Sequence, residues 1–418
     1  MKHITKILLL TLPLSWAAMA NADQNPQDLI AKGAYLARAG DCTACHTASG
    51  GKPFAGGYKI VSGLGTIFST NITPSKTAGI GNYSEKQFAD AVRKGIRADG
   101  AYLYPAMPYP DYRGITDADI HALYTYFMQG VAPVDSAAPA TDLSFPFSQR
   151  WGMRFWNYVF TDDKNFQAAS PANEEINRGK YLVETLGHCG SCHTPRGIAM
   201  QEKSLNDSDS TFLAGGDLNG WPVPSLRHMD GWKDKDIADY LGAGRNDFAA
   251  VGGEMTSVVQ HSMQYMSDAD LMAIAHYLKS LPDDKPVGNK KPDAVQASSE
   301  TTKILTEGKN LSSGQLLYLN NCEACHWTDG NGAKGIFPHL NGSDLVRADN
   351  PNALIGTILK GAQTPSTSRS PSVLFMPGFA SRLTDEQVAE LATFIRGGWS
   401  NNAPAVTTDQ VKKVRDKE

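Results

Sequence analysis

All six cysteines of the 418-residue chain fall into three copies of the pattern Cys-x-x-Cys-His. The copies are Cys42–His46, Cys189–His193 and Cys322–His326. Two thiols at this spacing can form thioethers to the edge of a porphyrin, and the adjacent imidazole then lies under the iron. The pattern therefore predicts three covalently attached c-type haems on these cysteines. The first cysteine of each pair is Cys42, Cys189 or Cys322, the second is Cys45, Cys192 or Cys325, and the iron ligands are His46, His193 and His326.

Three other chemistries use the same residue types. An even number of cysteines in an exported chain can form a disulfide framework, and one Cys-x-x-Cys pair before a chance histidine can be a thiol redox site. A zinc site would need a second Cys/His pair for each motif, which the chain does not have. Three copies that consume every cysteine favour haem over all three.

The group on the opposite face of a His-ligated haem iron decides whether the haem carries electrons or binds a substrate. Met376 is the only methionine after the third motif, and Pro377 follows it. In the first repeat Met107 has the same context, with Pro108 after it, whereas Met128 falls at the end of a predicted helix. These patterns predict Met107 and Met376 as iron ligands.

The second repeat offers three methionines in the corresponding region. Met255 lies 62 residues after the motif histidine, close to the 61 residues found in the first repeat, and it is the predicted ligand. Met263 is the runner-up, and Met266 is better explained as a hydrophobic staple before a helix. His188 is predicted to be a neighbour of the haem. Histidine could replace methionine as the ligand, from His121, His228, His261, His276 or His339.

The same arrangement of helices surrounds each motif, which is internal repetition at the scale of one small domain. Opening helices are predicted over 28–39, 174–185 and 312–320, and closing helices over 116–128, 267–281 and 384–396. Each closing helix begins with Ser or Thr followed by acidic residues, as N-caps do. Gly33, Gly179 and Gly314 lie in the opening helices, where a missing side chain would let the two helices cross closely. The segments resemble class I cytochrome c domains, so the predicted fold class is mainly α with three such domains in tandem.

The composition is that of a globular protein, with 41% hydrophobic and 20% charged residues. The formal net charge of -4 gives no global positive field, so we expect no nucleic-acid partner. The first 22 residues have the features of a signal peptide: Lys2 and Lys6, a short apolar run, and Ala20-Asn21-Ala22 as a cleavage site. An uncleaved membrane anchor is the alternative. No later run is long and apolar enough to predict a membrane span.

The predicted organisation alternates haem domains with connecting segments. An aromatic patch in the first linker, Phe145-Pro146-Phe147 with Trp151, Phe155 and Trp156, is predicted to pack between domains rather than to bind a partner. The second linker, rich in Pro, Lys and Ser, is predicted to lie on the surface. The predicted boundaries are 1–22 signal peptide, 23–131 first domain, 132–173 linker, 174–282 second domain, 283–308 linker, 309–399 third domain and 400–418 polar tail.

The motifs and their surroundings resemble the triple-haem cytochrome c subunit of membrane-associated alcohol, gluconate and sugar dehydrogenases of Gram-negative bacteria. The resemblance covers nearly the whole mature chain. Its most specific segments are 69–74 with 79–81, 104–109, 145–147 with Arg150, 254–259 with His261-Ser262, and 337–340.

This resemblance implies a partner and a location. A catalytic dehydrogenase subunit, a flavoprotein or a quinoprotein, would oxidise a hydroxyl compound and deliver electrons to this chain. The chain would pass them to ubiquinone or another respiratory acceptor, on the periplasmic face of the inner membrane, as a peripheral protein. Relatives are often tethered through the end of this subunit, but the tail here is short and polar.

Two other classes of function are weighed against the electron carrier. A stand-alone enzyme, such as a peroxidase or a thiosulfate-oxidising multihaem protein, would need an open sixth position with acid/base residues beside it. A cytochrome subunit of a terminal oxidase commonly has a membrane span. The electron carrier is favoured because every repeat offers a methionine before its closing helix, and no catalytic residue is assigned to the chain itself.

Overall fold

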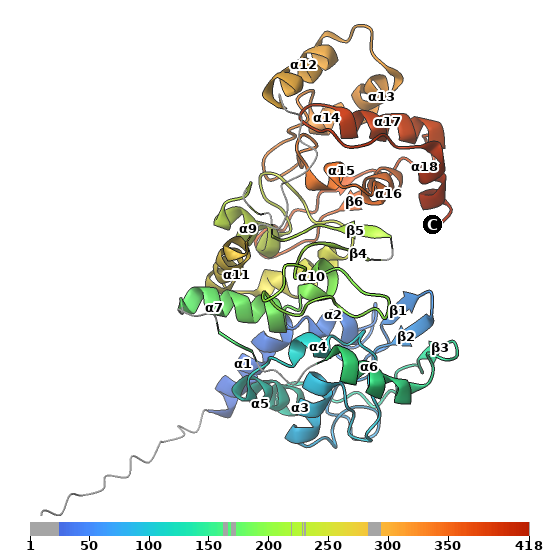
Figure 1. The fold of residues 1–418 in the computed structure, drawn as a ribbon. Helices are drawn as coiled ribbons and strands as arrows, with labels where there is room; N and C mark the ends of the chain where they lie inside the picture. Colours follow the sequence, from blue (N-terminus) through green and yellow to red (C-terminus); the bar gives the residue numbers. More distant parts are fainter. Residues whose placement is uncertain are drawn as a thin grey trace, which may run out of the picture.

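Three helical units follow one another along the molecule, in a computed structural model that describes residues 25–161, 166–168, 173–218, 220–227, 229, 231–282 and 294–417. Figure 1 shows the first unit at the bottom, the second in the middle and the third at the top. The predicted signal peptide lies outside the described residues. Within those ranges, no helix has the length and apolar character needed to cross a membrane. The prediction of a mainly helical protein is confirmed.

The first unit combines helices with a small sheet of order β1-β2-β3. β1 (Lys59–Ser62) and β2 (Gly65–Phe68) form an antiparallel hairpin in which Lys59 lies opposite Phe68, and β3 (Asp142–Leu143) pairs antiparallel with β2. The helical elements of this unit are α1 (Pro26–Ala39), α2 (Cys42–His46), α3 (Glu85–Lys94), α4 (Tyr109–Tyr112), α5 (Asp117–Thr125) and the π-helical turn η1 (Tyr126–Gly130).

The second and third units repeat this order of helices around two-stranded hairpins, β4-β5 and β6-β7. The second contains α7 (Glu174–Tyr181), the π-helical η3 (Leu182–Leu186), α8 (Gly190–His193), β4 (Gly216–Leu218), β5 (Trp221–Val223), α9 (Asp234–Ala243), α10 (Met255–His261), η4 (Met263–Tyr265) and α11 (Asp268–Ser280). The third contains α13 (Ser313–Asn321), α14 (Glu323–His326), α15 (Asp344–Arg347), α16 (Asn352–Lys360), β6 (Ala362–Gln363), β7 (Phe375–Met376), α17 (Asp385–Gly397) and α18 (Thr408–Arg415).

Each unit is held by a close crossing of its opening and closing helices, which are α1 with α5, α7 with α11 and α13 with α17. The crossing point is the predicted glycine in every case. A Cβ atom on Gly33, Gly179 or Gly314 would lie 2.1, 1.9 or 2.4 Å from a backbone oxygen of the closing helix. The closing helices begin as predicted, because the hydroxyls of Thr116, Ser267 and Thr384 accept hydrogen bonds from backbone N–H groups three residues further on.

The buried side chains form two hydrophobic clusters. One runs through the first and second units without a break, from Leu36 to Leu281, and the other belongs to the third unit. Contacts between the second and third units are both polar and apolar: Arg369 binds the Met266 carbonyl at 2.8 Å and pairs with Asp268, and Phe248 packs edge-on against His339. The first two units therefore pack as a pair, and the third is attached to them through its surface.

The segments predicted as linkers and tail are more ordered than expected. The first linker forms η2 (Arg150–Gly152) and α6 (Met153–Phe160), with most of its aromatic side chains exposed instead of packed between domains. Trp156 and Phe166 reach the second unit: the Trp156 indole N–H donates to the Ala199 carbonyl at 2.9 Å, and the Phe166 ring lies edge-on to Tyr181. Part of the second linker is helical, as α12 (Ala294–Glu307).

The predicted polar tail belongs to the core of the third unit. Its helix α18 buries Val411 completely, and Arg415 binds the Asp385 carboxylate at 2.7 Å. Apolar residues at the start and middle of the segment face α16 and α17, so a tail that is polar on average still has a buried side.

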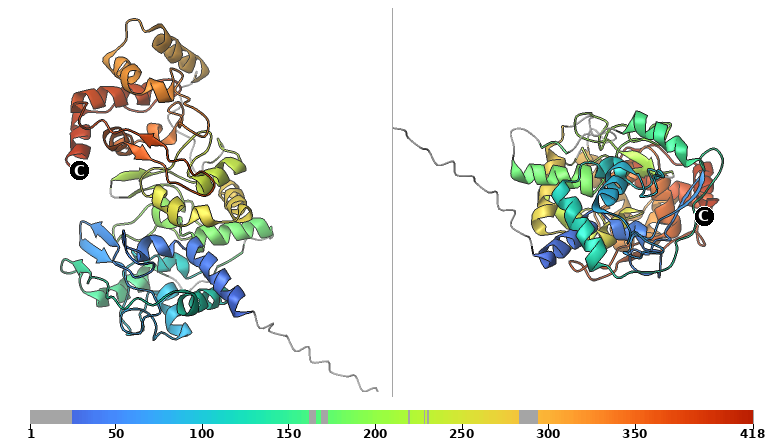
Figure 2. Two further views of the ribbon diagram at one scale, coloured as in Figure 1. Left: turned by 180° about the vertical axis from the view of Figure 1, so that it is seen from behind. Right: turned by 90° about the horizontal axis from the view of Figure 1, so that it is seen from below.

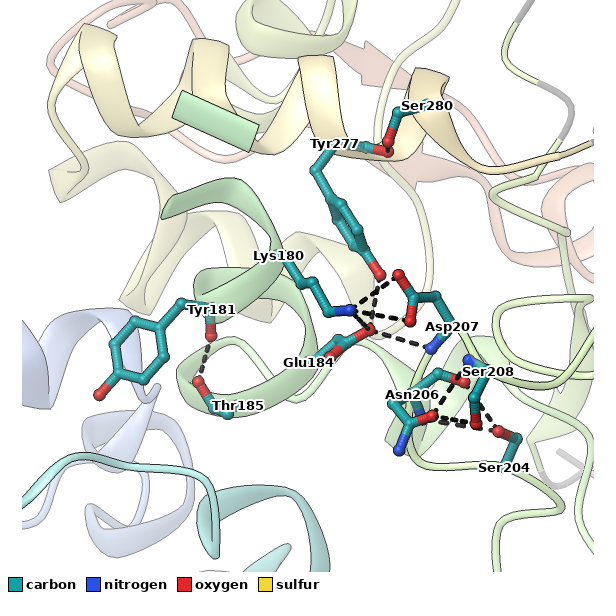
Figure 3. Close-up of polar contacts among 10 residues, drawn as sticks. All are labelled: Lys180, Tyr181, Glu184, Thr185, Ser204, Asn206, Asp207, Ser208, Tyr277 and Ser280. Atoms are coloured by element: carbon teal, nitrogen blue, oxygen red, sulfur yellow. Dashed lines mark hydrogen bonds and ion pairs between the residues drawn. The ribbon is translucent and has the colours of Figure 1, made fainter. Parts of the chain in front are cut away.

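A buried charge network stabilises the crossing of α7 and α11 (Figure 3). The Glu184 carboxylate accepts hydrogen bonds from the Tyr277 hydroxyl at 2.6 Å and from the Asp207 backbone N–H at 3.0 Å. The Lys180 ammonium binds Asp207 at 2.8 Å and lies 3.9 Å from Glu184. Burial raises the pKa of Glu184 from 4.5 to about 7.

The substitution Gly314→Ala should destabilise the third unit. Its added methyl would lie 2.4 Å from the Glu390 carbonyl oxygen, so α13 and α17 would have to separate, at a cost of about 1 to 3 kcal/mol. The midpoint of thermal unfolding, measured by calorimetry, should fall. Gly397→Ala in α17 is the matched control: its methyl would enter open space, and the midpoint should stay or rise slightly. Equal effects of the two variants would contradict the close crossing.

The substitution Glu184→Gln should weaken the dependence of stability on pH. The folded state binds the Glu184 proton more tightly than the unfolded chain, so the free energy of unfolding falls as pH rises from about 4.5 to about 7. This contribution is at most about 3 kcal/mol and is absent in the variant. Denaturant unfolding at several pH values in this window measures the difference. Glu174→Gln, at the exposed start of the same helix, should keep the wild-type slope.

Candidate functional site

Each Cys-x-x-Cys-His motif forms a short helix directly after the opening helix of its unit. These motif helices are α2, α8 and α14, in which Cys189 and Cys322 stand as N-cap residues. All six thiols are free and half-buried, so none is used in a disulfide. A helical turn brings the two cysteines of a motif to the same side, next to the histidine that ends the turn.

The environment of the thiols is unlike that of a thiol redox centre. Burial raises the pKa of Cys42 to about 12, of Cys45 to about 11, and of Cys189 and Cys322 to about 12. Redox-active Cys-x-x-Cys pairs instead have a depressed thiol pKa, because the thiolate is the nucleophile. The structure therefore disfavours the thiol redox alternative.

Each of the three motif histidines makes an equivalent hydrogen bond, which orients its ring for binding a metal. The Nδ1 atom lies 2.7 Å from the Thr70 carbonyl oxygen in His46, 2.8 Å from that of Pro224 in His193 and 2.9 Å from that of Pro338 in His326. A carbonyl can only accept, so Nδ1 carries the proton and Nε2 keeps its lone pair for iron. Burial also lowers the pKa of all three imidazoles, which favours the neutral form that a ligand requires.

The predicted methionine ligands lie in loops or at element ends that pack on the cores of their units. Met107 and Met255 border the shared cluster of the first two units, and Met376, on β7, borders the cluster of the third. Met255 begins α10, whereas the runner-up Met263 is buried inside the core.

The helix α10, which begins at Met255, packs against the first motif helix α2. Burial is the main cause that raises the pKa of Cys45, and Asp41, Cys192 and Glu254 add to the rise. The start of α10 therefore lies at the interface between the first and second units.

Three of the histidines considered as alternative ligands, His121, His276 and His339, contact other side chains, whereas the hydrogen bond at His261 runs from Arg38 to its backbone carbonyl. His121 lies 3.1 Å from Glu85, and His276 lies 3.0 Å from Glu175, both at the surface. His339 packs edge-on against Phe248 between the second and third units. His188 contacts Tyr112 of the first unit, and His228 lies outside the described residues.

Comparison with known proteins agrees with this geometry. The pattern of the family described as cytochrome c matches residues 30–130, 176–282 and 311–399, one match for each unit. The chain belongs to the cytochrome c family. The three matches, together with cysteines and histidines suited to the group, mean that this cytochrome c carries three covalently bound haem c groups. Bound haem iron supplies one-electron redox chemistry.

Curated relatives resemble this cytochrome c over nearly its full length. The gluconate 2-dehydrogenase cytochrome c subunit of Pantoea cypripedii is 45% identical over 433 residues, covering 100% of this chain and 96% of the relative. The cytochrome c subunit of alcohol dehydrogenase (quinone) from Gluconacetobacter polyoxogenes is 45% identical over 414 residues, or 96% and 87%. The fructose dehydrogenase cytochrome subunit of Gluconobacter japonicus is 40% identical over 408 residues, or 92% and 82%.

The sequence analysis missed how the first two haem domains of this cytochrome c are joined. The Tyr35 hydroxyl of α1 donates to Asp270 of α11 at 2.5 Å, and the Tyr181 hydroxyl of α7 donates to Asp119 of α5 at 2.7 Å. Each tyrosine lies two residues after a crossing glycine, and each aspartate lies three residues after the N-cap of a closing helix. The two domains therefore exchange equivalent contacts across a pseudo-twofold arrangement.

A second set of contacts joins the two attachment motifs themselves. The Tyr112 hydroxyl donates to the Gly40 carbonyl at 2.5 Å, and its ring lies edge-on to His188 with centroids 5.4 Å apart. Gly40 is two residues before the first motif, and His188 directly precedes the second. Ser191, inside the second motif, donates to the buried Asp111 carboxylate at 3.1 Å. The first and second motifs therefore meet at one interface.

With Met255 as the predicted ligand of the second haem, the substitution Met255→Ala should remove one of the three predicted methionine–iron bonds. Ferric haem with a methionine ligand has a weak far-red absorption band, and the variant should lose about one third of its intensity, one haem of three. Magnetic resonance should show one haem changed to a high-spin form. Met263→Ala is the control, with three methionine-bound haems retained. Loss of the band in Met263→Ala, with Met255→Ala unchanged, would transfer the assignment to Met263.

Proposed function

We propose that this chain is the electron-transfer subunit of a dehydrogenase complex on the periplasmic face of the inner membrane. The observation that carries the proposal is the likeness, at 40% to 45% identity over nearly the full length, to subunits named as cytochromes of gluconate, alcohol and fructose dehydrogenases. Three haem domains of the same construction within one chain support a relay, because electrons can pass between haems that are held near one another.

In this proposal each haem is held by one set of equivalent residues. The thioethers are formed by Cys42 and Cys45, by Cys189 and Cys192, and by Cys322 and Cys325. Histidine and methionine fill the two axial positions of each iron, which favours electron transfer and leaves no site for a substrate. The axial pairs are His46 with Met107, His193 with Met255, and His326 with Met376.

The donor and the acceptor are part of the same proposal. A catalytic subunit with a flavin or quinone cofactor oxidises an alcohol, a sugar or a sugar acid and reduces this chain. Ubiquinone in the inner membrane takes the electrons. The protein itself is peripheral, with its signal peptide removed on export. The chain therefore catalyses no reaction of the substrate and transfers electrons between its two redox partners.

Purification of the native complex tests this function. A flavin- or quinone-containing dehydrogenase subunit should co-purify with the chain, and one of gluconate, ethanol or fructose should reduce its haems within the complex. The separated cytochrome, with the same substrate, should stay oxidised. Reduction of the separated chain by the substrate would instead identify it as an enzyme, and the absence of any dehydrogenase subunit from the complex would reject the proposed partner.

A further inference from the structure

One face of the first unit exposes a cluster of large apolar side chains. This aromatic face consists of Phe145, Phe147, Trp151, Phe155, Tyr158 and Val159, from the segment that leads into α6 and from α6 itself. Phe145 is 81% exposed, Trp151 67% and Tyr158 88%. The tip of the β1-β2 hairpin adds exposed Val61 and Leu64, and the Ser144 N–H donates to the Leu64 carbonyl at 3.0 Å. Figures 1 and 2 show α6 and this small sheet on the same side of the first unit.

The aromatic face is held firmly by polar contacts on its inner side. Arg150 donates to the Tyr102 carbonyl at 2.9 Å and stacks over the Tyr104 ring at 4.5 Å. The Tyr104 hydroxyl donates to the Phe147 carbonyl at 2.8 Å, and the Tyr109 hydroxyl to the Asn157 side chain at 2.6 Å. α6 therefore holds Trp156 and Asn157 against the protein and presents Phe155, Tyr158 and Val159 to solvent.

The charge of this segment distinguishes it from the rest of the protein. Between Leu143 and Phe160 there is no acidic residue, whereas Arg150 and Arg154 are basic, in a chain whose formal net charge is -4. Arg154 is exposed beside the aromatic side chains, and Lys59 on β1 is exposed as well. Asp142, one residue before the segment, is exposed, and Asp99 interacts with Arg150. The segment itself combines exposed Trp, Tyr and Phe with basic side chains, as do helices that lie in the interface of an anionic bilayer.

The contacts on the inner side lead directly to the first haem site. Tyr104 and Tyr109 flank Met107, the proposed axial ligand, in the loop Tyr104-Pro105-Ala106-Met107-Pro108-Tyr109. The residues that anchor the aromatic face are thus the same residues that shape this ligand loop. In contrast, α18 at the other end of the chain is packed into the third unit.

We propose that the aromatic face docks on the phospholipid surface of the inner membrane, with Trp151 and Phe155 inserted among the lipid headgroups. This inference rests on the proposed function, in which the electron acceptor is dissolved in the bilayer. Docking through this face holds the first haem closest to the membrane. The polar tail then has no role as an anchor.

Vesicle flotation with the full three-haem protein tests the docking face. The probe is a vesicle of phosphatidylethanolamine and phosphatidylglycerol, and the protein is the mature holo-chain without its partner. Wild-type protein should float with the vesicles, and the double variant Trp151→Ser with Phe155→Ser should bind them at least tenfold more weakly. Wild-type binding should be weaker on phosphatidylcholine vesicles, because the basic residues then have no anionic headgroups to meet.

Leu316→Ser with Ile336→Ser is the matched control, since both side chains are exposed apolar residues of the third unit. This control should float like the wild type, and the haem spectra and circular dichroism of both variants should be unchanged. Wild-type protein that does not float, or a face variant that floats equally well, would overturn the inference. Loss of the co-purifying dehydrogenase subunit from the face variant, with vesicle binding intact, would also overturn it by showing a protein interface.

Substrate-driven haem reduction in the detergent-solubilised complex separates this inference from the proposed function. The face variant should be reduced as fast as the wild type there, because no bilayer is needed for the donor reaction. Reduction without vesicle binding would reject the docking face alone. Vesicle binding without any dehydrogenase that reduces the haems would reject the proposed function and retain the surface.

Discussion

The close crossing of an opening and a closing helix at a glycine is the constraint on which each unit depends. Backbone approaches backbone there, as between Gly179 and the Ala273 carbonyl, so the two helices have one relative position. The opening helix ends at the attachment motif, and the closing helix follows the loop with the methionine. A fixed crossing therefore fixes the distance between the attachment motif and the loop that holds the proposed methionine ligand.

The three sites share one chemistry, but their surroundings differ. A backbone carbonyl orients each of His46, His193 and His326 in the same way, so all three imidazoles are prepared to bind iron through Nε2. The first two units share a core and exchange Tyr–Asp contacts, whereas the third has Leu316 and Gln387 at the equivalent positions. The structure thus joins two haem domains through one shared core, whereas the third has a core of its own.

The first two units share a core and the third has its own, which is consistent with an electron relay whose two ends meet different partners. The first and third units lie at opposite ends of the molecule. Among the described residues, only the first unit displays a continuous aromatic surface. The anchoring contacts of that surface pass through Tyr104 and Tyr109 to the loop of Met107. The proposed docking surface is in this way built on the loop that holds the proposed ligand of the first haem.

The sequence by itself determined the haem motifs, the repeat of helices and the crossing glycines. These features depend on the local spacing of cysteine, histidine and glycine, whose chemistry or size suits few other roles at these positions. It could not determine the Tyr35–Asp270 and Tyr181–Asp119 pairs, since residues over 60 positions apart meet only when two domains pack. The carbonyl groups that orient the histidines belong to the backbone, so no residue type in the sequence could predict them. The aromatic segment around α6 was expected to be buried because aromatic residues usually are. Only the tertiary structure decided that Trp156 and Asn157 face the protein while Phe155, Tyr158 and Val159 face solvent.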